Sequence, residues 1–308
     1  MPYSLLNRFQ GTLLGAAIGA RIPGPLAHGK PHPPASSANP VQNGTSDAQV
    51  NPTQVAIASI RAWIESGGVP DRQWVSTISR LSPPDPVTFS PTEAMAILPV
   101  ILFGHESPSL LRNTLYHTLD ILSTPPDIKE GLFALGYAIA QALRNTLQPT
   151  LVIPQLLDTL ETSETRFAEQ LQRVQGLVAE GAGLEIARER LAIAPLASPL
   201  PESSPILLAF YSFLSTPEQF QLAVMRATQG SQAPLCALLT AALSGAYNSI
   251  QGIPLSWRLD AGQSGKEMLK SSDRLLAAWS GVYDLDNSPP PFRQLPAVGA
   301  PNVIRPRE

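Results

Sequence analysis

Few residues in this sequence have the type and spacing that catalysis or metal binding requires. His28 and His32 are four residues apart, as zinc ligands on a helix are, but the Gly- and Pro-rich stretch around them cannot be helical. Glu93 could act as a general base, or it could simply complement the dipole of the helix predicted to begin beside it. His105 and His117 have no placed partner, and we interpret them as structural. No Ser or Cys has a motif that implies an activating base.

Composition excludes several classes of partner. The formal net charge is −3, and no run of Lys and Arg occurs, so neither nucleic acid nor an anionic membrane is expected as a partner. Cys236 is the only cysteine, which excludes intrachain disulfides and a cysteine-based zinc cluster. We therefore expect a cytoplasmic protein. Residues 227–257 carry no charge and could span a bilayer, but their Gln, Asn and Pro content favours the central helix of a soluble bundle.

Apolar residues recur at helical spacing along most of the chain, and no segment alternates as a half-buried strand would. The sequence therefore predicts an all-α fold. The 32 prolines gather in clusters that mark connections between helices. The expected helices cover residues 5–20, 51–66, 71–81, 91–103, 108–122, 128–147, 150–161, 164–179, 183–192, 204–213, 217–228, 233–250 and 265–282. We expect one helical domain over residues 1–285 and a proline-rich C-terminal extension over residues 286–308.

Two of these segments carry a specific pattern. In residues 8–19, the small residues Gly11, Gly15 and Gly19 fall on one helix face, which allows a neighbouring helix to approach closely. Residues 237–247 end in Gly-Ala-Tyr and are followed by Gly-Ile-Pro and then Trp257. Both stretches resemble, in the same order, motifs of the ADP-ribosylglycohydrolase family. Residues 54–58 and 94–99 resemble two further segments of that family.

The resemblance implies a fold and a chemistry. The fold would be an orthogonal helical bundle, here with proline-rich loops between its helices. Active members of the family hold two magnesium ions in a central cleft and hydrolyse an N- or O-glycosidic bond to ADP-ribose. In the family, carboxylates from three motifs provide the oxygen ligands that such hard cations require.

This chain departs from the family at each of those motifs. Ala20 replaces the aspartate of the opening helix, and the family's T-D-D-T reads Val-Asn-Pro-Thr at residues 50–53. The family's G-G-D-[ST]-D-T reads Gly-Ser-Gln-Ala-Pro-Leu at residues 230–235. Only Asn51 and Gln232 keep a side-chain oxygen at these positions, and two neutral amides cannot balance two divalent cations. We therefore expect no metal and no other cofactor.

Two functions remain open. The first is a catalytically inactive binding or scaffold protein, whose ligand would be an unidentified protein or a nucleotide-like small molecule. The alternative is a hydrolase of ADP-ribosylated protein, or of a related ADP-ribose glycoside, with altered or residual chemistry that uses Glu93, Asp47 or another acid that the motifs do not place. No catalytic residue can be assigned. The residues expected to line the cleft are Arg21, Asn51, Thr53, Glu93 and Gln232.

Overall fold

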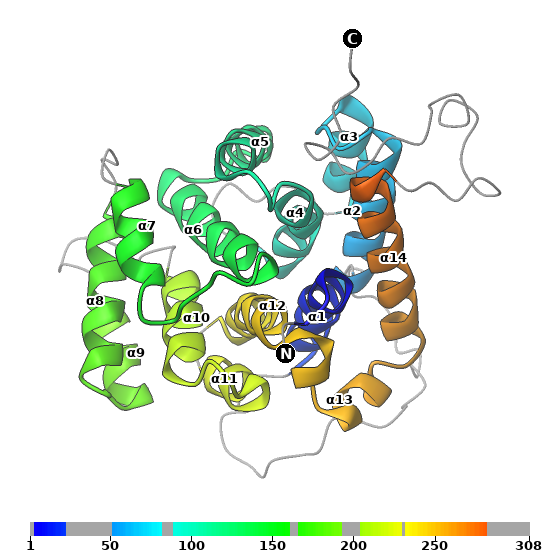
Figure 1. The fold of residues 1–308 in the computed structure, drawn as a ribbon. Coiled ribbons are helices and arrows are strands. Elements are labelled where there is room, and N and C mark those ends of the chain that lie inside the picture. Colours follow the sequence, from blue (N-terminus) through cyan, green and yellow to red (C-terminus); the bar gives the residue numbers. More distant parts are fainter. Residues whose placement is uncertain are drawn as a thin grey trace, which may run out of the picture.

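The computed structural model describes residues 3–22, 51–81, 89–160, 166–192, 204–229 and 232–281. These ranges contain fourteen helices and no strand, which confirms the all-α prediction (Figure 1). The helices are α1 (Leu5–Gly19), α2 (Pro52–Glu65), α3 (Arg72–Leu81), α4 (Pro91–Phe103), α5 (Pro108–Ile121), α6 (Pro126–Leu143), α7 (Val152–Leu160), α8 (Phe167–Ala179), α9 (Leu184–Ala192), α10 (Ser204–Ser215), α11 (Phe220–Ala227), α12 (Ala233–Gly252), α13 (Leu255–Asp260) and α14 (Gly262–Ser280).

The centre of the molecule is an antiparallel pair formed by α1 and α12, which lie side by side in Figure 1. A Cβ atom placed on Gly245 would lie 2.1 Å from the carbonyl oxygen of Gly11. Similar atoms on Gly15 and Gly19 would lie 2.6 Å and 2.5 Å from backbone oxygens of α12. The two backbones therefore touch without intervening side chains, and this confirms the close approach predicted from the spacing of the glycines.

Helix α12 is long and apolar enough to cross a membrane, but 83% of its most apolar window is buried inside the fold. That burial is typical of the core helix of a soluble protein. Pro234 lies in its first turn, where the missing N–H costs no hydrogen bond. The helix is broken near its end by Ser249, which has φ 59° and ψ −178°. Arg8 donates hydrogen bonds to the carbonyl oxygens of Ala246 and Tyr247, at 2.9 and 3.0 Å. It thereby provides hydrogen-bond partners for carbonyl groups close to the break in the helix.

Pairs of contacts fix how the helices around this centre run. The Ser59 hydroxyl on α2 donates to the Ala96 carbonyl on α4, and the ring of Trp63 packs 6.3 Å from that of Phe103, so α2 and α4 run in the same direction. Phe9 near the start of α1 packs 5.4 Å from His105, just beyond the end of α4, so α1 runs the opposite way. The first turns of α2, α4 and α12 therefore lie at the same end of the bundle as the last turn of α1. We call this end the N-terminal pole.

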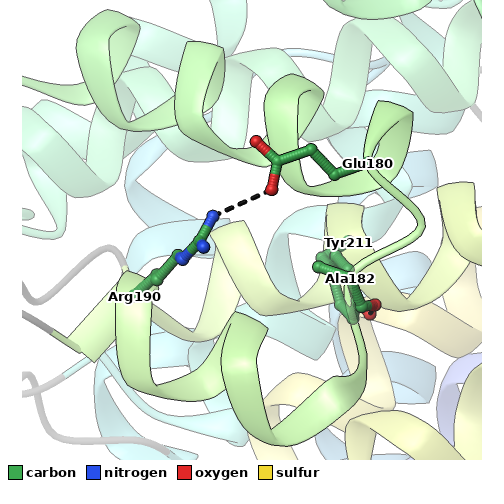
Figure 2. Close-up of polar contacts among 4 residues, drawn as sticks. All are labelled: Glu180, Ala182, Arg190 and Tyr211. Carbon is green, nitrogen blue, oxygen red and sulfur yellow. Dashed lines mark hydrogen bonds and ion pairs between the residues drawn. The ribbon is translucent and has the colours of Figure 1, made fainter.

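Helices α8 and α9 form a second group, which packs against α10. The Tyr211 hydroxyl on α10 donates to the Ala182 carbonyl at 2.5 Å and fixes the turn between α8 and α9 (Figure 2). Across the same turn, the Arg190 guanidinium lies 2.9 Å from the Glu180 carboxylate. Both of these charged side chains are more than half exposed, so their ion pair adds little stability compared with the buried tyrosine.

The helix boundaries follow the sequence predictions within a few residues, with one omission. The short helix α13 was not predicted, because its six residues are too few to show a period and none of them is buried. Helix α11 begins at Phe220 rather than Pro217, and α6 begins at Pro126 rather than Ile128, because Pro126 is well suited to a first turn. The proposed domain boundary near residue 285 lies outside the described residues.

Candidate functional site

The start of α2 carries two of the residues expected to line the cleft. The exposed Asn51 is the N-cap of this helix, and its side-chain oxygen accepts a hydrogen bond from the Thr53 N–H at 3.0 Å. Thr53 is only 1% exposed, and its hydroxyl oxygen is buried without a hydrogen-bond partner. An unpaired buried hydroxyl lowers the stability of a fold by about 1–3 kcal/mol. If Thr53 had only a structural role, its hydroxyl would therefore destabilise the protein.

Glu93 lies in the first turn of α4, at the same pole. Its Oε2 atom accepts hydrogen bonds from the Ser90 N–H at 2.7 Å and the Ser90 hydroxyl at 2.8 Å, and the Ser90 hydroxyl in turn accepts from the Glu93 N–H. This reciprocal arrangement is a capping box. Glu93 is 4% exposed and stabilises the helix terminus, which is the simpler of its two interpretations. The Ser-x-x-Glu spacing of residues 90–93 in the sequence is typical of such a capping box.

The start of α12 supplies the third part of the pole. Gln232 is the exposed N-cap of this helix, but its side chain makes no capping hydrogen bond. Pro234 is exposed in the first turn, and Leu235 is buried. Residues 230 and 231, which complete the corresponding motif, lie outside the described residues.

Arg21 follows α1 at this pole and is exposed. Its Nη1 atom lies 3.5 Å from the Ala261 carbonyl, at the junction of α13 and α14. The five expected cleft residues therefore come from the ends of four helices. Asn51 and Thr53 contact each other directly, whereas Glu93 is bound to Ser90 and Arg21 reaches toward α14.

The donor set at the pole does not fit the family's pair of magnesium ions. The described residues offer two amides, one hydroxyl and the capped carboxylate of Glu93. Nowhere in the described ranges do three or more His, Cys, Asp or Glu side chains gather as a metal ion requires. Hard divalent cations need several carboxylate oxygens to offset their charge. Val50, Asp47, His28 and His32 lie outside the part of the chain that the structure describes.

The remaining histidines, His105 and His117, are not among the residues expected to line the cleft. His105 is 2% exposed and is held between the rings of Phe9 and Trp279. Burial lowers the pKa of His105 to about 4, and its Nδ1 atom bonds to the Leu102 carbonyl. His117 is exposed on α5. The packing of His105 is that of a core residue.

Comparison with known families settles the relationship. The family model for ADP-ribosylglycohydrolase matches residues 1–284, which is nearly the whole chain. The chain belongs to the ADP-ribosylglycohydrolase family. Among solved structures, 43 chains match, and one of these is described as an ADP-ribosylglycohydrolase-related protein complex. It shares 18% sequence identity with a TM-score of 0.57, over 89% of this chain and 99% of that chain, and so supports the shared fold alone. No curated protein matches this chain in a sequence search.

Proposed function

We propose that this chain is a catalytically inactive member of the ADP-ribosylglycohydrolase family, which acts in the cytoplasm as a binding or scaffold protein. The observation that carries the proposal is the donor set at the N-terminal pole. The family positions at α2 and α12 present Asn51, Pro52, Gln232 and Pro234, and none of these carries a negative charge.

The preserved framework supports the same proposal. Gly11, Gly15 and Gly245 hold α1 against α12 at distances that admit no larger residue. The chain therefore has the close helix packing of the family motifs without carboxylates at the matched positions. Function depends on the site and not on the fold, so a retained fold without ligands fits binding better than hydrolysis.

The proline substitutions point in the same direction. Pro52 and Pro234 each lie in a first turn, where proline suits the helix and supplies neither an N–H group nor a ligand oxygen from its side chain. In both places, the sequence favours helix stability over metal binding.

Thermal unfolding tests the proposal directly. Magnesium together with ADP-ribose should leave the melting temperature within error of that measured with EDTA, because a ligand stabilises only a protein that binds it. Hydrolysis of an ADP-ribosylated peptide should not exceed the rate without protein. A stoichiometric magnesium site found by titration calorimetry would contradict the proposal.

Two variants sharpen this test. Gln232→Asp should bind no magnesium and restore no hydrolysis, because one carboxylate is too few for two cations. Glu93→Gln distinguishes the alternative function, in which Glu93 is a general base. If the wild-type chain hydrolyses the substrate and this variant does not, while both remain folded by circular dichroism, the alternative is correct.

A further inference from the structure

Helix α13 presents an apolar face that the fold leaves uncovered. Leu255 and Leu259 are four residues apart, so they lie on one face of this helix, where they are 62% and 69% exposed. They are the two most exposed large hydrophobic residues in the part of the chain that the structure describes. The ring of Trp257 lies on the other side of the helix, 6.1 Å from that of Phe220. No residue of α13 is buried, and a helix of six residues needs packing contacts to be stable in water.

Helix α11 continues this apolar surface. The contact between the rings of Phe220 and Trp257 joins α11 to α13, and both helices lie at the lower edge of the molecule in Figure 1. Phe220 is on the buried face of α11, which leaves Leu222 and Met225 exposed on the opposite face. We call Leu222, Met225, Leu255 and Leu259 the α11–α13 surface.

This gathering distinguishes the α11–α13 surface from the rest of the described exterior. The other exposed large hydrophobic residues each lie on a different segment: Tyr3, Val69, Leu110, Leu151 and Ile186. Single exposed apolar residues are normal on a soluble protein, whereas several that lie on two contacting helices and are bordered by polar groups mark an interaction site.

Charged residues of both signs border the α11–α13 surface. Glu218 and Arg226 lie beside its α11 part, and Arg258 and Asp260 lie beside its α13 part. Within the described residues, none of these four forms an ion pair. The Nε atom of Arg258 is buried without a hydrogen-bond partner. Two positive and two negative charges are therefore left for a partner to pair.

A second copy of this chain fits that charge pattern. In a dimer with two-fold symmetry, the same surface lies on both sides of the interface, so each contact between two different residues occurs twice. The leucines of one copy would then pack on those of the other, and its basic groups would meet the acidic groups of the other. A partner of one charge sign would be attracted by two of the four charges and repelled by the other two.

We propose that this chain forms a two-fold symmetric homodimer through the α11–α13 surface, in which ion pairs between the two copies surround an apolar centre. The inference goes beyond the proposed function and does not depend on it, because neither a metal ion nor a substrate contributes to this surface.

Sedimentation velocity of the full chain tests the proposal. The sedimentation coefficient should rise from that of a monomer to that of a dimer as the protein concentration increases. Leu259→Asp should raise the dissociation constant of the dimer roughly thirtyfold or more, because each copy would bring an unpaired carboxylate into an apolar interface. Leu259 is mostly exposed in the single chain, so the variant should keep its far-UV circular dichroism. Leu110→Asp, at a half-exposed leucine on α5, is the matched control and should dimerise as the wild type does.

Two double variants test the charge pairing. Arg226→Glu combined with Arg258→Glu makes the border acidic, and Glu218→Arg combined with Asp260→Arg makes it basic. Each double variant alone should stay monomeric where the wild type dimerises, because like charges would face each other across the two-fold axis. An equal mixture of the two should form dimers, since opposite charges then meet again.

The remaining outcomes overturn the inference. These are a wild-type chain that is monomeric at every concentration, a Leu259→Asp variant that dimerises as tightly as the wild type, and a mixture of the double variants that stays monomeric. If the wild type is monomeric and Leu259→Asp lowers its melting temperature, another segment of the same chain covers the surface instead. None of these measurements involves metal binding or hydrolysis, so failure here is distinguishable from failure of the proposed function.

Discussion

His105 should make the stability of this protein depend on pH in a way that one substitution removes. The ring is buried between Phe9 and Trp279, and its Nδ1 atom lies 2.7 Å from the Leu102 carbonyl. Since a carbonyl can only accept, Nδ1 carries the hydrogen and Nε2 is the atom that gains a proton in acid. Burial is the main cause that lowers the pKa of His105 to about 4, and the nearby Arg144 charge lowers it further.

The sign and size of the effect follow from linkage. The unfolded chain binds a proton at His105 with a pKa of about 6.5, whereas the folded chain does so only near 4. A lowered pKa in the folded state means that the stability contributed by neutral His105 is present above pH 6.5 and is lost as the pH falls toward 4. The full difference is about 3 kcal/mol, of which about 1.4 kcal/mol is lost between pH 7.5 and pH 5.5.

The assay is urea denaturation of the wild-type chain and His105→Gln at pH 7.5, 6.5 and 5.5. Subtracting the two curves cancels the carboxyl groups that titrate in both proteins. The free energy of unfolding should fall by about 1.4 kcal/mol more in the wild type than in the variant over this range. Parallel curves for the two proteins would show that His105 titrates normally and is not buried as described.

Three further predictions test the core. Gly245→Ala should lower the stability of the fold by about 3 kcal/mol or more, because its Cβ would overlap the α1 backbone. Gly176→Ala, where a Cβ meets nothing within 4 Å, should raise the stability by about 0.5–1 kcal/mol, and thermal melts of both variants measure the two effects. Leu239→Asp should abolish soluble expression, while Leu222→Asp, at a 41% exposed site, should not; equal yields would contradict the central position of α12. Burial raises the pKa of Cys236 to about 12, so a thiol reagent at pH 8 should label it only after urea unfolds the chain.

The helices of this protein could be predicted from local patterns. Proline in a first turn, as at Pro52 and Pro91, and apolar residues at helical spacing are properties of short segments, and the structure places helices there. The proposed loss of carboxylates at the family positions likewise depends only on residue identity. Helix α13 escaped prediction because it has neither the length nor the buried face that such patterns need.

The candidate site could be predicted only in part. The sequence named Asn51, Thr53 and Glu93 from their places in family motifs, but it could not say what each side chain does. Glu93 proved to close a capping box with Ser90, and Thr53 proved to hold a buried, unpaired hydroxyl. Nothing in the sequence around His105 indicates that its pKa lies far below that of a free histidine.

The sequence by itself determined which segments are helical and which helix face of α1 admits a close neighbour. Only the tertiary structure decided that the starts of α2, α4 and α12 share one end of the bundle, that the Thr53 hydroxyl is left unpaired, and that His105 is enclosed by Phe9 and Trp279. The physical reason is that helix formation depends on residues within a few turns of one another. Burial, hydrogen-bond partners and pKa depend on neighbours that are distant in the sequence and meet only when the helices pack.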